Sequence, residues 1–399
     1  MPVTTIIRLA GRGDGVTDDA RHIAFAAPGD RIAADGTIEP GPHHATPPCR
    51  HFPRCGGCQL QHVDDSAYRD FLTDRVTHAL AGQGLAIPEM REPHLSPPRT
   101  RRRASLRVER IGRKVVIGFN EGQSHRIIDM RECHILRPEL FDLIDPLRRL
   151  LGPMLKEKRQ ANVRMTLADQ GVELALEGVT AEGLAASESL TAFAQLHRLA
   201  RLSIDEGYGS EPRWEPEPVT VTLGGVAVPL PANAFLQATA DGEAALLAGV
   251  TEAVGGATTI ADLFAGLGTF ALPLATHARV LAVEGAREPA LALKMAANRS
   301  QRPLMVEPRD LFRRPLDATE LGRFEAVAID PPRAGAKEQI PALIDAKAVA
   351  RIAFVSCNPG TFARDAKMLV DGGWRLDWIR PIGQFRWSTH VELVAALTR

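Results

Sequence analysis

The feature that most constrains the fold is a series of five short apolar runs in the last third of the chain, each separated from the next by a helix-length segment. The runs are Thr259–Phe264, Val280–Glu284, Leu304–Val306, Ala326–Asp330 and Ile352–Ser356. Apolar strands that alternate with helices are typical of βαβ units. The series predicts an α/β fold with a doubly wound, mostly parallel sheet. Two later runs, Trp374–Pro381 and Val391–Leu397, are expected to pair as its antiparallel edge.

The rest of the chain divides at two proline-rich stretches, Glu39–Pro48 and Glu211–Pro218. Before the first, short β-prone runs broken by turns predict a small β-barrel. Between the two stretches we expect a central α+β domain. Its expected elements are a helix near Ala67–Ala81 and strands around Ala104–Arg110, Val115–Phe119 and Val172–Leu176. The predicted domains are therefore residues 1–45, 46–217 and 218–399.

The overall composition excludes several classes of protein. An apolar share of 45% with 24% charged residues is that of a globular protein, not of a disordered one. No stretch reaches the ~18 uninterrupted apolar residues that a membrane span needs. The N-terminus has no basic region followed by an apolar one, so we expect a cytoplasmic protein. Nothing in the sequence calls for an obligate protein partner, and we expect a monomer.

One local stretch is strongly basic although the whole chain carries no formal net charge. Between Arg99 and Lys114 there is a single acid, Glu109, among eight basic residues. These are Arg99, Arg101, Arg102, Arg103, Arg107, Arg110, Arg113 and Lys114. Such a stretch is either a solvated strand face or a surface for phosphate groups, since arginine matches phosphate oxygens without reading a base.

The first apolar run leads into a glycine-containing loop, Asp262 to Gly268 (DLFAGLG). Glycines at this position let the backbone approach a ligand at the start of a helix. Glu284 ends the next run, where an acid binds ribose hydroxyls in nucleotide-binding folds. The loop lacks the third glycine of the dinucleotide pattern and resembles the first motif of class I S-adenosylmethionine methyltransferases.

Two further polar groups follow strands of the same predicted sheet, and a third lies in its last strand. Asp330 opens a stiff DPPR sequence after the fourth run, and Cys357 lies in SCNP after the fifth. Cys357 is either a small buried hydrophobe or a nucleophile presented by a turn. Glu392 interrupts an apolar strand, HVELVAAL, and is either an ion-paired edge residue or a general base with a pKa raised by partial burial.

The motifs DLFAGLG, DPPR, SCNP and HVE occur in this order and together resemble the RNA uracil-5-methyltransferase family. The resemblance is to the branch that modifies 23S ribosomal RNA and carries an iron–sulfur cluster. It spans nearly the whole chain, because residues 3–40 resemble a shortened TRAM-type RNA-binding barrel. A Rossmann-like methyltransferase domain is therefore expected at the C-terminal end.

The resemblance implies a covalent mechanism. Cys357 would add to C6 of uracil, C5 would take the methyl group of S-adenosylmethionine, and Glu392 would remove the C5 proton. The implied cofactor contacts are Gln237, Phe264, Thr269, Glu284, Asp310 and Asp330. The chain departs from the family pattern at Thr239 and Asp310, where relatives often have Asn.

Four of the five cysteines form a separate pattern: Cys49, Cys55 and Cys58 are clustered around Gly56-Gly57, and Cys133 follows at a distance. Four thiolates suit either zinc or an iron–sulfur cluster, and the resemblance implies [4Fe–4S]. A site that joined Cys133 to the other three would fix the basic stretch between them. On this ground we predict RNA contacts at Arg99, Arg101, Arg102 and Arg103.

The sequence therefore predicts methylation of C5 of a uridine in 23S ribosomal RNA. One alternative is the same reaction on the T-loop uridine of transfer RNA, and another is methylation of a base nitrogen, which needs no nucleophile. A non-catalytic iron–sulfur RNA-binding protein is the alternative from another class.

Overall fold

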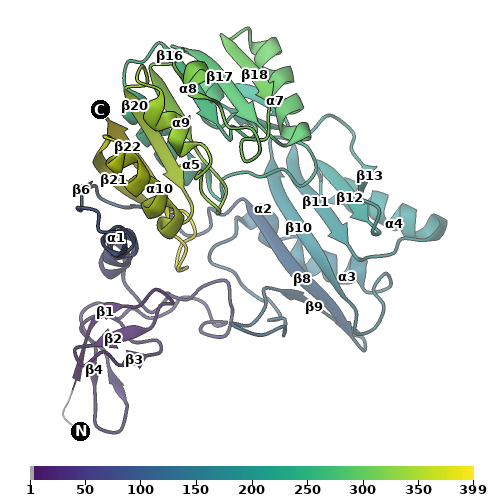
Figure 1. Cartoon of the computed structure of the whole chain (residues 1–399). Coiled ribbons are helices and arrows are strands. Elements are labelled where there is room, and N and C mark those ends of the chain that lie inside the picture. Colours follow the sequence, from purple (N-terminus) through teal and green to yellow (C-terminus); the bar gives the residue numbers. More distant parts are fainter. Residues whose placement is uncertain (1–3) are drawn as a thin grey trace. The chain divides into compact units, whose positions relative to one another are not determined.

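The computed structural model describes residues 4–399, so the first three residues of the predicted N-terminal domain lie outside the described part. The chain forms two compact units from interleaved segments (Figure 1). Unit 1 contains the described residues up to Phe71, then Ser96–Val219 and Phe385–Thr389. Unit 2 contains Leu72–Leu95, Thr220–Gln384 and His390–Arg399. Within residues 4–399, none of the helices is long and apolar enough to cross a membrane.

Unit 1 begins with five short antiparallel strands in the order β3-β2-β1-β4-β5. They are β1 (Thr4–Leu9), β2 (Gly15–Thr17), β3 (His22–Ile23), β4 (Arg31–Ile32) and β5 (Ile38–Glu39). A small core of Ile6, Ala26 and Ile32 holds them together. Among the described residues β3 and β5 do not pair, so the predicted barrel is a curled half-barrel. Strands of two or three residues are too short to close one.

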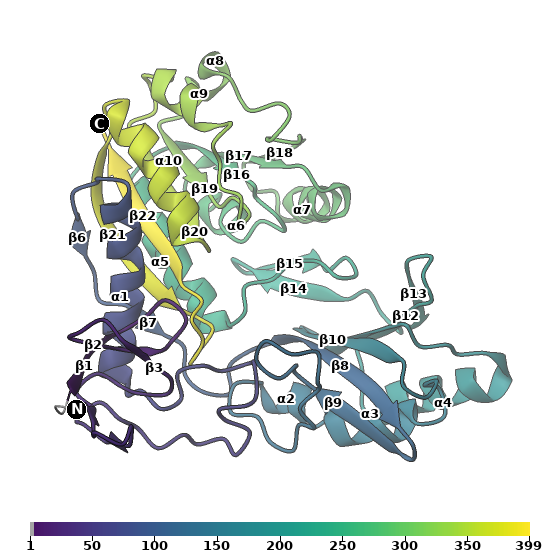
Figure 2. The same cartoon turned by 60° about the horizontal axis from the view of Figure 1, so that its bottom comes forward.

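The second sheet of unit 1 has six strands in the order β13-β12-β11-β10-β8-β9. They are β8 (Arg103–Ile111), β9 (Lys114–Gly118), β10 (Gln160–Ala168), β11 (Gly171–Glu177), β12 (Arg201–Asp205) and β13 (Ser210–Trp214). Three helices pack on it: α2 (Pro138–Phe141), α3 (Ile144–Leu151) and α4 (Gly183–Leu196) (Figure 2). Along β8 the buried residues Ala104, Leu106 and Val108 alternate with polar residues, as in a sheet with one face on the core.

The second proline-rich stretch is not wholly a linker, because β13 occupies its first half. Pro212 lies in this strand opposite Ser203 of β12. Proline cannot donate a ladder hydrogen bond, but β13 is the edge of the sheet, where that donor is not needed. The composition of the stretch therefore misled the prediction.

Unit 2 is built on a nine-stranded sheet in the order β18-β17-β16-β19-β20-β22-β21-β6, with β7 also paired to β21. Its strands are β6 (Glu89–Met90), β7 (His94–Leu95), β16 (Thr259–Leu263), β17 (Arg279–Glu284), β18 (Leu304–Pro308), β19 (Ala326–Ile329), β20 (Arg351–Ser356), β21 (Arg375–Gly383) and β22 (Glu392–Thr398). The five predicted parallel strands and the antiparallel edge are confirmed. The two short strands β6 and β7 were not predicted.

Helices lie on both faces of this sheet, with α5 on one side and α9 and α10 on the other (Figures 1 and 2). The helices are α5 (Ala240–Val254), α6 (Ala271–Leu274), α7 (Arg287–Ser300), α8 (Ala318–Leu321), α9 (Ile340–Asp345) and α10 (Pro359–Asp371). A hairpin of β14 (Thr220–Leu223) and β15 (Val226–Pro229) precedes α5. Helix α1 (Asp65–Gly82) contributes residues to both units.

The strand order reverses between β16 and β19. Chain connections leave in opposite directions at such a switch point, and a crevice opens beyond the carboxyl ends of the strands. The loops after β16, β17, β19 and β20 therefore lie together at the carboxyl ends of the parallel strands, and they carry most of the predicted site residues of unit 2.

Candidate functional site

The loop after β16 has the backbone of a ligand cradle. Phe264 takes a positive φ of 62°, and Gly266 and Gly268 also lie in the left-handed region. A Cβ at Gly268 would come within 2.4 Å of Leu293 Cδ1, so the loop packs too closely there for any side chain. No atom lies within 4 Å of a Cβ built on Gly266, so the backbone at this position faces open space.

Glu284, at the end of β17, is fixed by two backbone donors. The N–H of Gly266 donates to its Oε2 over 2.8 Å, and the N–H of Ala286 donates to its Oε1 over 2.6 Å. The glycine loop and the acid are thus joined directly, as the sequence interpretation requires. Beside them the rings of Phe264 and Phe312 lie 5.5 Å apart.

Asp310 and Thr239, the two positions that depart from the family pattern, have local structural partners. Asp310 is exposed and accepts a hydrogen bond from the N–H of Phe312 over 3.0 Å. Thr239 is buried and caps helix α5 by accepting from the N–H of Gly242 over 3.1 Å. Threonine is a good N-cap, so this position is explained by helix α5 alone.

Two carboxyl groups at the same end of the parallel strands, those of Asp330 and Asp262, have raised pKa values. Burial, reinforced by the negative charges of Glu392 and Asp262, raises the pKa of Asp330 well above its ordinary value. Burial also raises the pKa of Asp262 to about 8, against a weaker lowering by the backbone N–H of Ala271. Asp262 is completely buried. It is therefore largely protonated near pH 7.

The raised pKa of Asp262 predicts a pH-dependent stability. A carboxyl whose pKa is higher in the folded chain stabilises the fold below its unfolded pKa and loses this contribution as the pH rises through the folded value. We expect Asp262→Asn, which cannot ionise, to show a flatter stability profile than the wild type between about pH 4 and pH 8. Urea unfolding at several pH values between about 4 and 8 measures the free energy of unfolding of both proteins. Exposed Glu338→Gln is the control, and parallel profiles for wild type and Asp262→Asn would contradict the prediction.

Cys357 and Glu392 emerge from neighbouring strands at matching positions. The register of β20 and β22 pairs Val355 with Val394 and Ser356 with Leu393. The next antiparallel step sets Cys357 opposite Glu392, at the carboxyl end of β20. Glu392 is 8% exposed, and its charge is close enough to raise the pKa of the Cys357 thiol. The structure therefore brings the predicted nucleophile and the predicted base together.

The turn that carries Cys357 is tightly fixed. Asn358 accepts from the N–H of Gly360 over 3.0 Å, which caps α10, and its amide donates to the carbonyl of Arg333 over 3.1 Å. The DPPR and SCNP loops are thus tied together. Burial raises the pKa of Cys357, the charges of Glu392 and Asp330 raise it further, and the Arg333 guanidinium opposes them. Arg333, which the motif contains but to which the sequence assigned no role, is the cation that favours the thiolate.

Gln237 belongs to a buried pair that no sequence motif marks. Gln384 donates from Nε2 to Oε1 of Gln237 over 2.8 Å and accepts on its own Oε1 from the N–H of Ala238 over 3.0 Å. Both glutamines are nearly fully buried. Because the pair fixes which end of the Gln237 amide is the acceptor, Gln384 orients that side chain. An isolated glutamine at the end of a strand gives no sequence signal for such a role.

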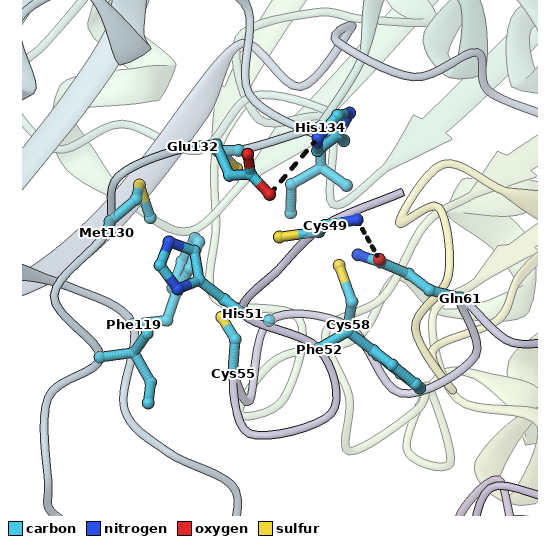
Figure 3. Close-up of a pocket in the computed structure, with 14 residues that line it drawn as sticks. Cys49, His51, Phe52, Cys55, Cys58, Gln61, Phe119, Met130, Glu132 and His134 are labelled. Atoms are coloured by element: carbon cyan, nitrogen blue, oxygen red, sulfur yellow. Dashed lines mark hydrogen bonds and ion pairs between the residues drawn. The ribbon is translucent and has the colours of Figure 1, made fainter. Parts of the chain in front are cut away.

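In unit 1 the four predicted ligands line one cavity. Cys49, Cys55 and Cys58 direct their sulfur atoms toward a shared space, and Cys133 lines it as well (Figure 3). No disulfide links them. The glycines between Cys55 and Cys58 are required, since a Cβ at Gly56 would lie 2.8 Å from the carbonyl oxygen of Asn120.

Hydrogen-bond donors are directed at these sulfur atoms. Burial raises the pKa of both Cys55 and Cys133, and it is opposed by the N–H of Gly57 at Cys55 and by the N–H groups of Ile135 and Leu136 at Cys133. Burial outweighs them and raises the pKa of Cys55 to about 11. A bound metal would instead deprotonate such thiols outright, and hydrogen bonds to sulfur are a feature of iron–sulfur sites.

The donor set also bears on the kind of metal group. Within residues 4–399, no three His, Cys, Asp or Glu side chains come close enough to share a single metal ion. The four cysteines line one cavity. Four unpaired cysteines around a cavity are a chemically suitable set for a group of several metal atoms.

The predicted RNA-binding arginines do not share one environment. Arg99 is exposed, and Arg103 lies on β8 with its neighbours Ala104 and Leu106 facing the core. Arg101 is different, because its guanidinium lies 5.2 Å from the ring of Phe385 and 5.8 Å from the ring of Phe119, which lines the cysteine cavity. Arg101 is therefore turned toward the cysteine cavity and is poorly placed for a phosphate.

Comparisons with known proteins show what the chain is similar to. Residues 226–399 match the family model described as tRNA (Uracil-5-)-methyltransferase. An uncharacterised RNA methyltransferase of Zymomonas mobilis is 52% identical over 394 residues, covering 99% of both chains. The 23S rRNA (uracil(1939)-C(5))-methyltransferase of Thiobacillus denitrificans is 32% identical over 430 residues, covering 100% of both.

One solved structure has the same fold along the whole chain. It is the tRNA (uracil-54, C5)-methyltransferase of Pyrococcus abyssi in complex with S-adenosyl-L-homocysteine, with a TM-score of 0.74, 24% identity and 100% coverage of both chains. Since relatives above 30% identity cover the whole sequence, the chain belongs to the RNA uracil-5-methyltransferase family.

Proposed function

We propose that this enzyme transfers a methyl group from S-adenosylmethionine to C5 of a uridine in 23S ribosomal RNA. The observation that carries the proposal is the pairing register of β20 and β22, in which Cys357 faces Glu392 beside the cradle formed by the β16 loop and Glu284. A nucleophile and a base that face each other across one strand pair suit a reaction that adds to one carbon and removes a proton from its neighbour.

In this mechanism the Cys357 thiolate attacks C6 of uracil, and the electron pair of the C5–C6 double bond becomes nucleophilic at C5. Bound S-adenosylmethionine supplies the electrophilic methyl group. Glu392 then accepts the C5 proton, the C5–C6 double bond forms again, and the bond between C6 and sulfur breaks. Cys357 leaves as a thiolate, so no oxidant or reductant is consumed. The positive charge of Arg333 favours the Cys357 thiolate both when it attacks C6 and when it leaves.

A uridine within folded RNA must leave its stack to reach Cys357. We propose that cations of unit 1 bind the phosphates of that RNA, namely the exposed Arg99 and the partly exposed Arg102 and Arg103. Arginine forks hold phosphates without reading sequence, so these contacts would set position and not base identity.

The choice of ribosomal RNA is supported by the full-length 23S enzyme relative. Transfer RNA is the second candidate, because the tRNA enzyme of Pyrococcus abyssi has the same fold along the entire chain. The test is to incubate purified protein with methyl-labelled S-adenosylmethionine and separate unmodified 23S and transfer RNA transcripts, and to map the label by mass spectrometry. 5-Methyluridine in 23S RNA supports the proposal. Label in transfer RNA alone would overturn the choice of ribosomal RNA and assign transfer RNA as the substrate. Label on a base nitrogen, or on neither RNA, overturns the proposal.

The cofactor would contact Gln237, Phe264, Thr269, Glu284, Asp310 and Asp330. Since Gln384 orients Gln237, we expect Gln384→Leu to raise KM for S-adenosylmethionine by about tenfold with little change in kcat, because one positioned hydrogen bond contributes on the order of 1 kcal/mol or slightly more. Steady-state kinetics at saturating RNA measure this. Glu338→Gln is the exposed control, and a fall in kcat with unchanged KM would contradict it.

We also propose that Cys49, Cys55, Cys58 and Cys133 hold a [4Fe–4S] cluster. The four free cysteines that line one cavity support a metal group there, and the N–H groups near the sulfur atoms of Cys55 and Cys133 suit an iron–sulfur cluster. Such a group would supply a rigid covalent junction between the loop at Cys49–Cys58 and the segment at Cys133. Anaerobic purification with iron, sulfide and zinc analysis tests it. About four irons and four sulfides per chain are expected, and one zinc instead would overturn the assignment.

A further inference from the structure

The segment Phe385–Thr389 is the part of the molecule that the mechanism leaves unexplained. It connects β21 to β22, which are both in unit 2, yet it belongs to unit 1. It ends three residues before Glu392, the first residue of β22. Its sequence, FRWST, has a bulky aromatic and a cation where a tight hairpin would need turn-forming residues.

Trp387 ties this segment to the cysteine loop. The carbonyl oxygen of Trp387 accepts two hydrogen bonds, from the N–H of Gln59 over 2.8 Å and from the N–H of Leu60 over 2.9 Å. These two residues directly follow Cys58. The indole is 7% exposed and belongs to the same hydrophobic core as Cys58. The main chain of Trp387 is therefore fixed by the segment that carries a predicted cluster ligand, and its side chain lies in the core of the same unit.

Arg101 makes a second connection between the cysteine cavity and this segment. Its guanidinium lies over the ring of Phe385, and its Nε donates to the carbonyl of Arg103 over 3.0 Å. Its backbone N–H donates to the carbonyl of Ile135, two residues after Cys133, over 3.0 Å. Arg101 is thus a partly buried cation that joins the segment after Cys133 to Phe385.

Polar contacts close the segment at both ends. The hydroxyl of Tyr68 lies 3.1 Å from the carbonyl oxygen of Phe385 and 3.0 Å from that of Ser388, and Tyr68 is fully buried. Arg386 forms an ion pair with Asp65 and lies over the ring of Trp387. A connection with this many partners is a fixed anchor rather than a free loop.

We propose that Trp387 is a positioning residue for proton removal: the cysteine loop, through Gln59, Leu60 and Trp387, fixes the chain that leads into Glu392. The inference rests on the proposed function, in which Glu392 acts only after the methyl group has been transferred. Strand ends open more easily than strand centres, and Glu392 is at the end of β22. The anchor prevents that opening. Addition of Cys357 to C6 and methyl transfer do not need the anchor, because β20 and the glycine loop carry the groups for those steps.

The test separates the steps in Trp387→Ala, using full-length protein with equal iron content and saturating RNA. Turnover on ordinary RNA measures the whole cycle. Trapping by RNA that carries 5-fluorouridine measures addition and methyl transfer alone. With fluorine in place of the C5 hydrogen, there is no C5 proton for the base to remove, and the adduct persists. We expect turnover to fall by about 10²-fold, as for a catalytic group displaced by roughly 1 Å. We expect fluorouridine trapping within about twofold of the wild type, and a denaturant-resistant methylated protein–RNA adduct that accumulates on ordinary RNA.

Matched variants distinguish positioning from general damage. Trp374→Ala removes another buried tryptophan, one within unit 2, and we expect no adduct to accumulate. Trp387→Phe retains an aromatic ring in the core and is expected to restore most of the turnover. Arg101→Gln, which removes the cation over Phe385, is expected to reproduce the adduct in milder form if Trp387→Ala does not fold.

Two outcomes overturn the inference while leaving the proposed function intact. One is equal loss of turnover and fluorouridine trapping in Trp387→Ala or Arg101→Gln. The other is unchanged turnover in both variants. Failure of the proposed function has a different signature, because the wild type itself then forms neither 5-methyluridine nor a fluorouridine adduct.

Discussion

Cys357→Ala is expected to abolish 5-methyluridine formation, with a loss of at least about 10⁴-fold in turnover, as when other enzymes lose their nucleophile. Without sulfur at this position nothing adds to C6, and C5 stays too weak a nucleophile to take the methyl group. Binding of S-adenosylmethionine is expected to persist, since the β16 loop and Glu284 are untouched. Calorimetric titration and a turnover assay with labelled methyl donor measure the two quantities.

The same variant distinguishes C5 methylation from methylation of a base nitrogen. Cys357→Ser keeps the size of the side chain but is a much poorer nucleophile at neutral pH. If Cys357→Ser forms methylated RNA at a rate within tenfold of the wild type, the covalent mechanism is excluded. Trapping by 5-fluorouridine RNA must disappear together with turnover, because both need the bond between sulfur and C6.

Glu392→Gln is expected to stop the cycle after methyl transfer. The amide cannot accept the C5 proton, so the methylated adduct remains attached to Cys357 and accumulates to about one per enzyme. Turnover should fall by roughly 10²- to 10⁴-fold, the usual contribution of a general base. Gel electrophoresis under denaturing conditions, with label in the methyl group, measures the adduct.

Glu338→Gln is the matched control, since it neutralises an exposed carboxylate in the same unit. It should leave turnover and adduct unchanged. If Glu392→Gln turns over like the wild type, another group removes the proton. The buried Asp330, whose charge acts on Cys357, is then the first residue to test.

The sequence predicts unit 2 better than unit 1, for a physical reason. A strand buried on both faces is apolar throughout, so β16, β17, β19 and β20 stand out from their neighbours. The N-terminal strands are two to six residues long and partly exposed, so the sequence indicated short strands broken by turns but neither their number nor the failure of the barrel to close. Strands β6 and β7, with two residues each, have no periodicity to detect.

Candidate site residues could be recognised from the sequence where a residue type is chemically unusual for its place, and not where its proposed role depends on a neighbour. An acid in an apolar strand marks Glu392, and a cysteine in a strand-end turn marks Cys357. Gln384 acts by orienting Gln237, and Arg101 lies within a basic stretch that looked uniformly exposed. Such roles depend on contacts between distant segments, which composition and spacing do not encode.

The interleaving of the two units has a consequence for how the molecule is made. The hydroxyl of Tyr68 meets the carbonyl of Ser388 across 320 residues of sequence, and Trp387 completes a core that begins near Cys58. A ribosome synthesises the cysteines early and Trp387 late. The core that contains Cys58 therefore stays incomplete until most of the central sheet of unit 2 has been synthesised. The docking of Trp387 is therefore a late event in biogenesis, and a chain that stalls before residue 385 should expose its thiols to oxidation and its apolar core to chaperones.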